Sequence, residues 1–164
     1  MAKFVVTGTK ELMRSLKKMG ADVGQSAFTA LDRGGQHFEN AVKITLSDRW
    51  GPRTGKVYAT GKKGSRFATH QASAPGEPPA KRSGLLMGSV THKTEKVGKM
   101  GAKGATGTNI EYAELLERGG INEDGFAVAP RPYLFSTMVK EAPEGMRIVS
   151  KSLHQDLLRY RKKK

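Results

Sequence analysis

The sequence contains no cysteine, and that absence excludes three kinds of chemistry at once. Disulfide crosslinks, thiolate nucleophiles and cysteine-ligated zinc sites all require the thiol, and a chain without it fits a reducing compartment. Long apolar runs are also missing: no stretch approaches the ~20 apolar residues that span a bilayer, and the N-terminal run is far shorter than a signal peptide's hydrophobic region. We therefore expect a soluble protein that is made in the cytoplasm and has no membrane partner.

Aromatic and acidic residues are scarce. Aromatics make up 7% of the 164 residues, and 15 acidic residues stand against 29 basic ones. A modest core of Leu, Val, Ala and Met is expected, within one domain over residues 1–164. The net charge of +14 is concentrated, because residues 49–103 carry +10 and the tail 159–164 carries +5. Such a concentration attracts nucleic acid, acidic protein surfaces or anionic lipid.

Catalytic signatures are scarce as well. The four histidines, at positions 37, 70, 92 and 154, follow no metal-binding spacing, and each is expected to be a surface or loop residue. Residues 51–57 resemble a phosphate-binding loop only superficially, because the loop is one residue short and no Ser or Thr follows Lys56. No Gly-x-Ser-x-Gly elbow is present. We expect no catalytic residue, no metal, no cofactor and hence no enzyme.

The residues that are present predict long helices in the first third of the chain. A short strand over 4–6 and a helix over 12–19 are expected before a long amphipathic helix over 22–48, whose apolar residues recur at steps of three and four. Gly34 and Gly35 lie in its middle, and each costs ~1 kcal/mol relative to Ala in a helix. They predict either a kink or close packing against another backbone.

The second half of the chain alternates short elements before a final helix. Strands are expected over 85–94, 102–108 and 126–128, with a helix over 111–118. Pro132 is suited to the first position of the last helix, which Pro143 would interrupt or restart. The predicted fold class is α+β: long amphipathic helices packed on a small antiparallel β-sheet, with a long extended loop.

That loop covers residues 49–83, which show neither a period of two nor one of 3.6. Trp50, Tyr58 and Phe67 are interleaved there with Arg and Lys. Aromatic and Arg residues are enriched at the centres of protein interfaces, but the same combination can stack on bases and neutralise phosphates. A protein interface is the favoured interpretation, because no nucleic-acid-binding fold signature is present.

Three stretches in order carry a resemblance to a known family. Residues 72–80 end in Ala-Pro-Gly-Glu-Pro-Pro-Ala and lead into Ser-Gly-Leu-Leu-x-x-Ser at 83–89. Residues 107–119 contain Tyr-Ala-Glu-Leu-Leu-Glu-Arg-Gly, and residues 129–134 read Ala-Pro-Arg-Pro-Tyr-Leu. Together they resemble the tail-completion, or neck, proteins of long-tailed bacteriophages. Ser83, Gly120 and Tyr133 replace the family's usual Thr, Thr and Phe.

The resemblance implies a structural virion protein of the phage neck or tail, made in the host cytoplasm. It would form a ring, expected to be a hexamer, and join the DNA-filled head to the tail during assembly. The implied partners are other copies of the chain, head-side connector or adaptor proteins, tail tube or tail terminator proteins, and packaged DNA in the channel. The alternative is a free-standing basic nucleic-acid-binding protein.

Candidate residues follow from the loop and from the three stretches. Residues 50–82 are expected to reach a neighbouring subunit or the head-side adaptor, with interface residues Trp50, Arg53, Tyr58, Phe67, Pro75, Pro78 and Pro79. Contacts to DNA or acidic surfaces are expected from Lys62, Lys63, Arg66, Arg161, Lys162 and Lys163. A scaffold role is expected for Gly84, Tyr112, Glu117, Gly119 and Pro132. Within that set, Tyr112 and Glu117 would position the strand at 121–128, and the carboxylates of the 111–118 helix would form a solvated face.

Overall fold

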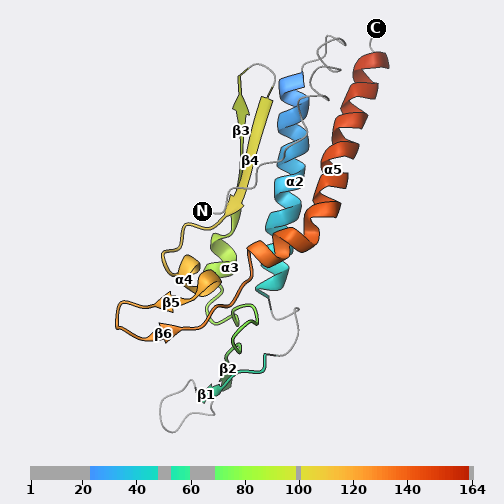
Figure 1. Cartoon of the computed structure of the whole chain (residues 1–164). Coiled ribbons are helices and arrows are strands. Elements are labelled where there is room, and N and C mark those ends of the chain that lie inside the picture. The colour runs from blue at the N-terminus through green and yellow to red at the C-terminus, as the bar shows by residue number, and fades with distance from the viewer. Residues whose placement is uncertain (1–22, 48–52, 60–68, 99–100, 163–164) are drawn as a thin grey trace. The chain divides into compact units, whose positions relative to one another are not determined.

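The computed structural model describes residues 23–47, 53–59, 69–98 and 101–162 (Figure 1). Its helices are α2 (Val23–Thr45), α3 (Leu85–Ser89), α4 (Tyr112–Arg118) and α5 (Phe135–Lys162). Its strands pair as antiparallel hairpins: β1 (Val57–Ala59) with β2 (Thr69–Gln71), β3 (Thr91–Val97) with β4 (Gly101–Gly107), and β5 (Gly120–Ile121) with β6 (Ala127–Val128). The predicted α+β class is confirmed. The strand expected at 4–6 and the helix expected at 12–19 lie outside the described residues.

The chain divides into two compact units. The first unit is made of residues 1–40, 91–107 and 140–164, and the second of residues 41–90 and 108–139. Both long helices contribute to both units, because α2 crosses the division after Asn40 and α5 crosses it after Val139. The segments that carry the family resemblance belong almost entirely to the second unit.

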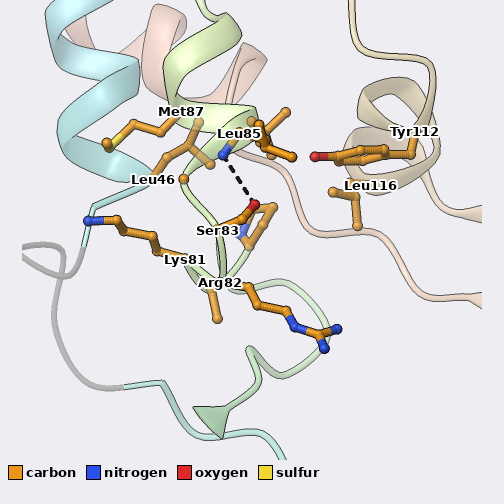
Figure 2. A pocket seen from close by; sticks show the side chains of 12 residues that line it. Leu46, Lys81, Arg82, Ser83, Leu85, Met87, Tyr112 and Leu116 are labelled. Atoms are coloured by element: carbon orange, nitrogen blue, oxygen red, sulfur yellow. Dashed lines mark hydrogen bonds between the residues drawn. The ribbon is translucent and has the colours of Figure 1, made fainter. Parts of the chain in front are cut away.

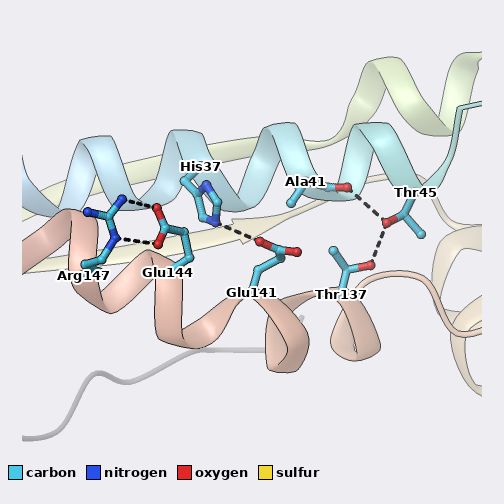
Figure 3. Close-up of polar contacts among 7 residues, drawn as sticks. All are labelled: His37, Ala41, Thr45, Thr137, Glu141, Glu144 and Arg147. Carbon is cyan, nitrogen blue, oxygen red and sulfur yellow. Dashed lines mark hydrogen bonds and ion pairs between the residues drawn. The ribbon is translucent and has the colours of Figure 1, made fainter. Parts of the chain in front are cut away.

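The core of the second unit is small and apolar. Its buried residues come from the end of α2 and the residue after it, from the residue after α3, from α4, and from the start of α5 and the two residues before it: Val42, Leu46, Val90, Ala113, Tyr133, Leu134 and Met138. A polar contact accompanies them, since the hydroxyls of Thr45 and Thr137 lie 3.0 Å apart and Thr45 also donates to the carbonyl of Ala41 (Figure 3). The 49–83 segment is not wholly irregular, because β1 and β2 pair within it.

The prediction of a strand over 85–94 is wrong for its first half. Residues 85–89 form the short helix α3, and the strand β3 begins only at Thr91. Gly84 precedes the helix with a φ of 80°, a conformation that glycine adopts without strain. The Ser83 hydroxyl accepts the N–H of Leu85 at 3.3 Å (Figure 2), and Ser89 donates to the carbonyl of Leu86. These local hydrogen bonds favour a helical turn where an apolar run alone is equally compatible with a strand.

In the first unit, α2 lies between the β3–β4 hairpin and α5 (Figure 1), and its central glycines make this approach possible. A Cβ at Gly34 would lie 2.7 Å from Val149 Cγ2, and one at Gly35 would lie 2.9 Å from His92 Cδ2. The helix is unbroken through both glycines. The glycines therefore permit close packing, but against the side chains of Val149 and His92 and not against another backbone as predicted.

Two histidines lie in this packed region, contrary to the expectation of surface or loop positions. His92 in β3 has Nδ1 2.6 Å from Glu39 and Nε2 3.4 Å from Asp32, and its backbone N–H also donates to Glu39. His37 on α2 has Nε2 3.3 Å from Glu141 on α5 (Figure 3). Each ring joins α2 to a neighbouring element, which spacing along the sequence cannot reveal.

Candidate interaction site

The three stretches that carry the resemblance meet in the second unit. The carbonyl of Pro130 accepts the N–H of Gly76 at 2.9 Å, and the carbonyl of Leu116 accepts the N–H of Arg131 at 2.7 Å. The guanidinium of Arg131 also donates to the carbonyl of Ser73, through two nitrogens at 3.4 Å each. The first and third stretches, more than forty residues apart in sequence, are therefore joined by one backbone bond and by the Arg131 side chain, and the second and third are joined by another backbone bond.

Glu117 connects α4 to the first turn of α5. Its carboxylate accepts the backbone N–H groups of Tyr133 at 2.8 Å, Leu134 at 3.0 Å and Phe135 at 2.8 Å. These donors have no acceptor within the helix, and a negative charge is favourable at a helix N-terminus. Glu117 is half-buried and contacts the start of α5, so it neither belongs to a solvated face nor contacts the 121–128 strand as predicted.

The same contact explains where α5 begins. The helix starts at Phe135 and not at Pro132, and it then continues through Pro143 without interruption. Both predictions made from proline alone are therefore wrong. Tyr133 is fully buried beside Glu117, and burial together with that nearby negative charge raises the pKa of its hydroxyl. A side chain from another helix has set the boundary.

Glu77 fixes the turn at the centre of the 72–80 stretch. Its carboxylate accepts the N–H of Ala74 at 2.9 Å, the N–H of Thr54 at 3.1 Å and the hydroxyl of Thr54. The hydroxyl bond is the main cause, followed by the N–H bonds, of a pKa for Glu77 below the ordinary value of 4.5. The acid of the Pro-Gly-Glu-Pro motif therefore ties this stretch to residue 54, at the other end of the long loop.

A pH-dependent stability follows from this lowered pKa. Because the folded state favours the ionised carboxylate, its contribution is present above pH ~4.5 and is lost as pH falls through the lower folded pKa. We expect Glu77→Gln to reduce stability more at pH 7 than at pH 3, measured by urea denaturation. Glu111→Gln, at an exposed position just before α4, is the control and should show no such difference. An equal cost of Glu77→Gln at both pH values would contradict the assignment.

The predicted interface residues are only partly described. Arg53 is half-buried and donates to the carbonyls of Thr45 at 3.4 Å and Pro79 at 3.2 Å. Pro78 and Pro79 are buried within the unit, whereas Pro75 is exposed. The backbone of Tyr58 lies in β1, opposite residue 70. Trp50 and Phe67 lie outside the described residues.

The predicted DNA-contact residues are largely outside the described chain. This applies to Lys62, Lys63, Arg66 and Lys163, while Arg161 and Lys162 end α5. The predicted scaffold residues are all described. Gly119 ends α4, where a Cβ would lie 2.8 Å from the carbonyl oxygen of Val128; Tyr112 is 44% exposed and Pro132 is half-buried.

Sequence reasoning did not find the pocket between α3 and α4. This α3–α4 pocket has a volume of about 200 Å³, and its apolar wall is formed by Leu46, Leu85, Leu86, Met87, Tyr112 and Leu116. Figure 2 shows Tyr112 and Leu116 opposite Leu46 and Met87, with Lys81 and Arg82 on the irregular segment below them. The volume is below the ~300–1,000 Å³ of typical small-molecule sites, so the pocket is suited to one or two side chains.

The second unit also exposes many large apolar residues. Those at least 44% exposed among its described residues are Ile44, Val57, Leu85, Tyr112, Ile121, Phe126, Phe135 and Val139. In the described ranges, no helix is long and apolar enough to cross a membrane. Over the same ranges, no group of three His, Cys, Asp or Glu could hold a metal ion.

Comparison with known proteins gives no family to which the chain can be assigned. No protein-family model, no curated protein and no solved structure matches it.

Proposed function

We propose that the protein is a structural component of the neck or tail of a long-tailed phage. It forms a ring and joins the DNA-filled head to the tail during assembly. The observation that carries this proposal is the exposed apolar surface of the second unit, the unit that also contains the three resembling stretches. Scattered exposed apolar residues are normal, but here they include a hairpin tip and the wall of a pocket.

The chemistry of this surface supports adhesion without turnover. Its exposed residues are mostly Leu, Ile, Val, Phe and Tyr, which contribute to binding by leaving water. The stretches around it are fixed through backbone hydrogen bonds and through Glu77 and Glu117, so the surface is held in shape before a partner arrives. A preformed surface loses less conformational entropy when it binds.

The positive charge of the chain supports a second, weaker attraction, to DNA or to an acidic protein surface. Residues 49–103 carry a net charge of +10, and Lys81 and Arg82 are exposed within this range. Packaged DNA or an acidic face of a head-side adaptor would be attracted to such a segment. The long loop with Trp50 and Tyr58 remains our candidate for reaching a neighbouring subunit or the adaptor.

Particles assembled without this protein test the proposal. In a phage that carries the gene, a nonsense mutation should yield DNA-filled heads and finished tails that remain separate in negative-stain images. Supplying the intact gene from a plasmid should restore joined particles. Normal infectious particles in the absence of the protein would contradict the proposal. Strong, salt-dependent DNA binding by a monomer would indicate the nucleic-acid-binding alternative.

A further inference from the structure

The β5–β6 hairpin is an exposed projection of the second unit. Its turn is closed by Asn122, whose side-chain oxygen accepts the N–H of Phe126 at 2.7 Å and whose carbonyl accepts the N–H of Gly125 at 3.0 Å. Gly125 has a φ of 81°, which glycine tolerates best. Ile121 is 73% exposed and Phe126 is 69% exposed. The tip therefore presents two large, exposed apolar side chains on either side of a hydrogen-bonded turn.

Such a projection is incomplete by itself. A two-stranded hairpin is marginally stable in water without a packed face, and here each strand has only two residues. Between the two apolar residues the turn carries Glu123 and Asp124, both exposed. The tip thus combines an apolar pair with two negative charges, in a protein whose net charge is +14.

The α3–α4 pocket has the complementary composition. Its wall is apolar, and Leu85 within it is 66% exposed. Lys81 and Arg82 supply two positive charges among the residues that line it. Its volume of about 200 Å³ suits an aromatic or branched side chain. Ile121 and Phe126 are not among the residues that line the pocket of their own chain.

We infer that the β5–β6 hairpin of one copy docks into the α3–α4 pocket of the next copy. Ile121 and Phe126 then cover the apolar wall, and the two acidic residues of the tip meet the two basic residues of the pocket. Opposite charges around a buried apolar centre give both orientation and specificity.

The two surfaces differ, so the contact can repeat from one copy to the next. A contact between unlike surfaces repeats head to tail and closes into a ring when the rotation allows. The inference deepens the proposed function and rests on it, since it names the subunit contact by which the proposed ring forms.

Charge-reversal substitutions in the purified full-length chain, at the hairpin tip and in the pocket, test the contact. Sedimentation velocity over a range of concentrations measures self-association. The double variants Glu123→Lys with Asp124→Lys, and Lys81→Glu with Arg82→Glu, should each weaken self-association about tenfold or more. An equimolar mixture of the two should restore it, because each altered hairpin then meets an oppositely altered pocket. Lys140→Glu with Lys151→Glu, on α5, matches the charge change of the pocket variant and should leave association unchanged.

Cysteine pairs provide a second readout, because the chain contains no cysteine of its own. Leu85→Cys combined with Phe126→Cys should give a ladder of disulfide-linked oligomers on a non-reducing gel under mild oxidation. Leu85→Cys combined with Val97→Cys, another exposed apolar position, should give none. Crosslinked dimers without larger species would overturn the head-to-tail arrangement. A purified chain that is monomeric throughout, or rings that persist in both charge variants, would overturn the contact itself.

These outcomes are separate from those of the proposed function. Rings that form through another surface would overturn the hairpin contact and leave head–tail joining intact. A hairpin-dependent ring in a phage that assembles normally without the protein would retain the contact and overturn head–tail joining.

Discussion

Replacing Glu117 with alanine should destabilise the second unit by about 2–4 kcal/mol. Three backbone N–H groups at the start of α5 lose their shared acceptor, and two of them belong to the buried residues Tyr133 and Leu134. Loss of a helix cap costs ~1 kcal/mol, and each buried donor left without a partner costs ~1–3 kcal/mol. The carboxylate's charge at the helix N-terminus is lost in addition.

Urea denaturation followed by circular dichroism measures this effect. Glu117→Gln keeps one acceptor oxygen and should fall between the wild type and the alanine variant. Glu114→Ala is the matched control on the same helix, because its exposed ion pair with Arg118, at 3.3 Å, contributes little to stability. If the alanine variants at 114 and 117 cost the same, the capping role of Glu117 is wrong.

Replacing Gly145 with valine should destabilise the first unit by about 2 kcal/mol or more. Gly145 is buried on α5, and a Cβ there would lie 2.5 Å from Cζ of Phe38 and 2.8 Å from Cε2 of the same ring. Overpacking of this kind typically costs ~1–3 kcal/mol. A valine adds two further methyl groups beyond the Cβ, so the gain of ~1 kcal/mol from removing a helical glycine cannot offset the overlap.

A double-mutant cycle assigns the cost to the ring. Combined with Phe38→Leu, Gly145→Val should cost less than the sum of the two single substitutions, because the shortened side chain vacates the space. Gly88→Ala on α3 is the control, since nothing lies within 4 Å of the added Cβ. Thermal denaturation is a sufficient readout. Strict additivity would show that the ring and the glycine are not in contact.

Local patterns in the sequence were sufficient for one long helix and two short elements. The amphipathic helix predicted over 22–48 is α2, and the predicted strand over 102–108 and helix over 111–118 correspond to β4 and α4. Each of these rests on repeated side-chain spacing or on a glycine that ends a helix. These signals lie within a few neighbouring residues, and the same neighbouring residues determine whether the helix or strand forms.

Apart from the short helix α3, which local hydrogen bonds favour, the errors arose where the structure depends on a residue far away in the sequence. The start of α5 is set by Glu117, which lies sixteen to eighteen residues earlier in the chain. The positions of His37 and His92 depend on carboxylates of other elements. The α3–α4 pocket needs residues from three segments together. None of these pairings leaves a periodic trace, whereas the Asn-Glu-Asp-Gly turn between Ile121 and Phe126 was a readable hairpin signal.

The β5–β6 hairpin also lies between two segments that hydrogen bonds hold in place, the end of α4 and the start of α5. On one side α4 ends at Arg118, and on the other the Leu116 carbonyl and the Glu117 carboxylate hold residues 131–135. The chain between these anchors adds little to the core, and lengthening an anchored loop costs little free energy. The excursion can therefore be lengthened, shortened or exchanged while the helices stay in register. Under the contact inferred above, the specificity of self-association can therefore diverge within about ten residues, without redesign of the scaffold that presents them.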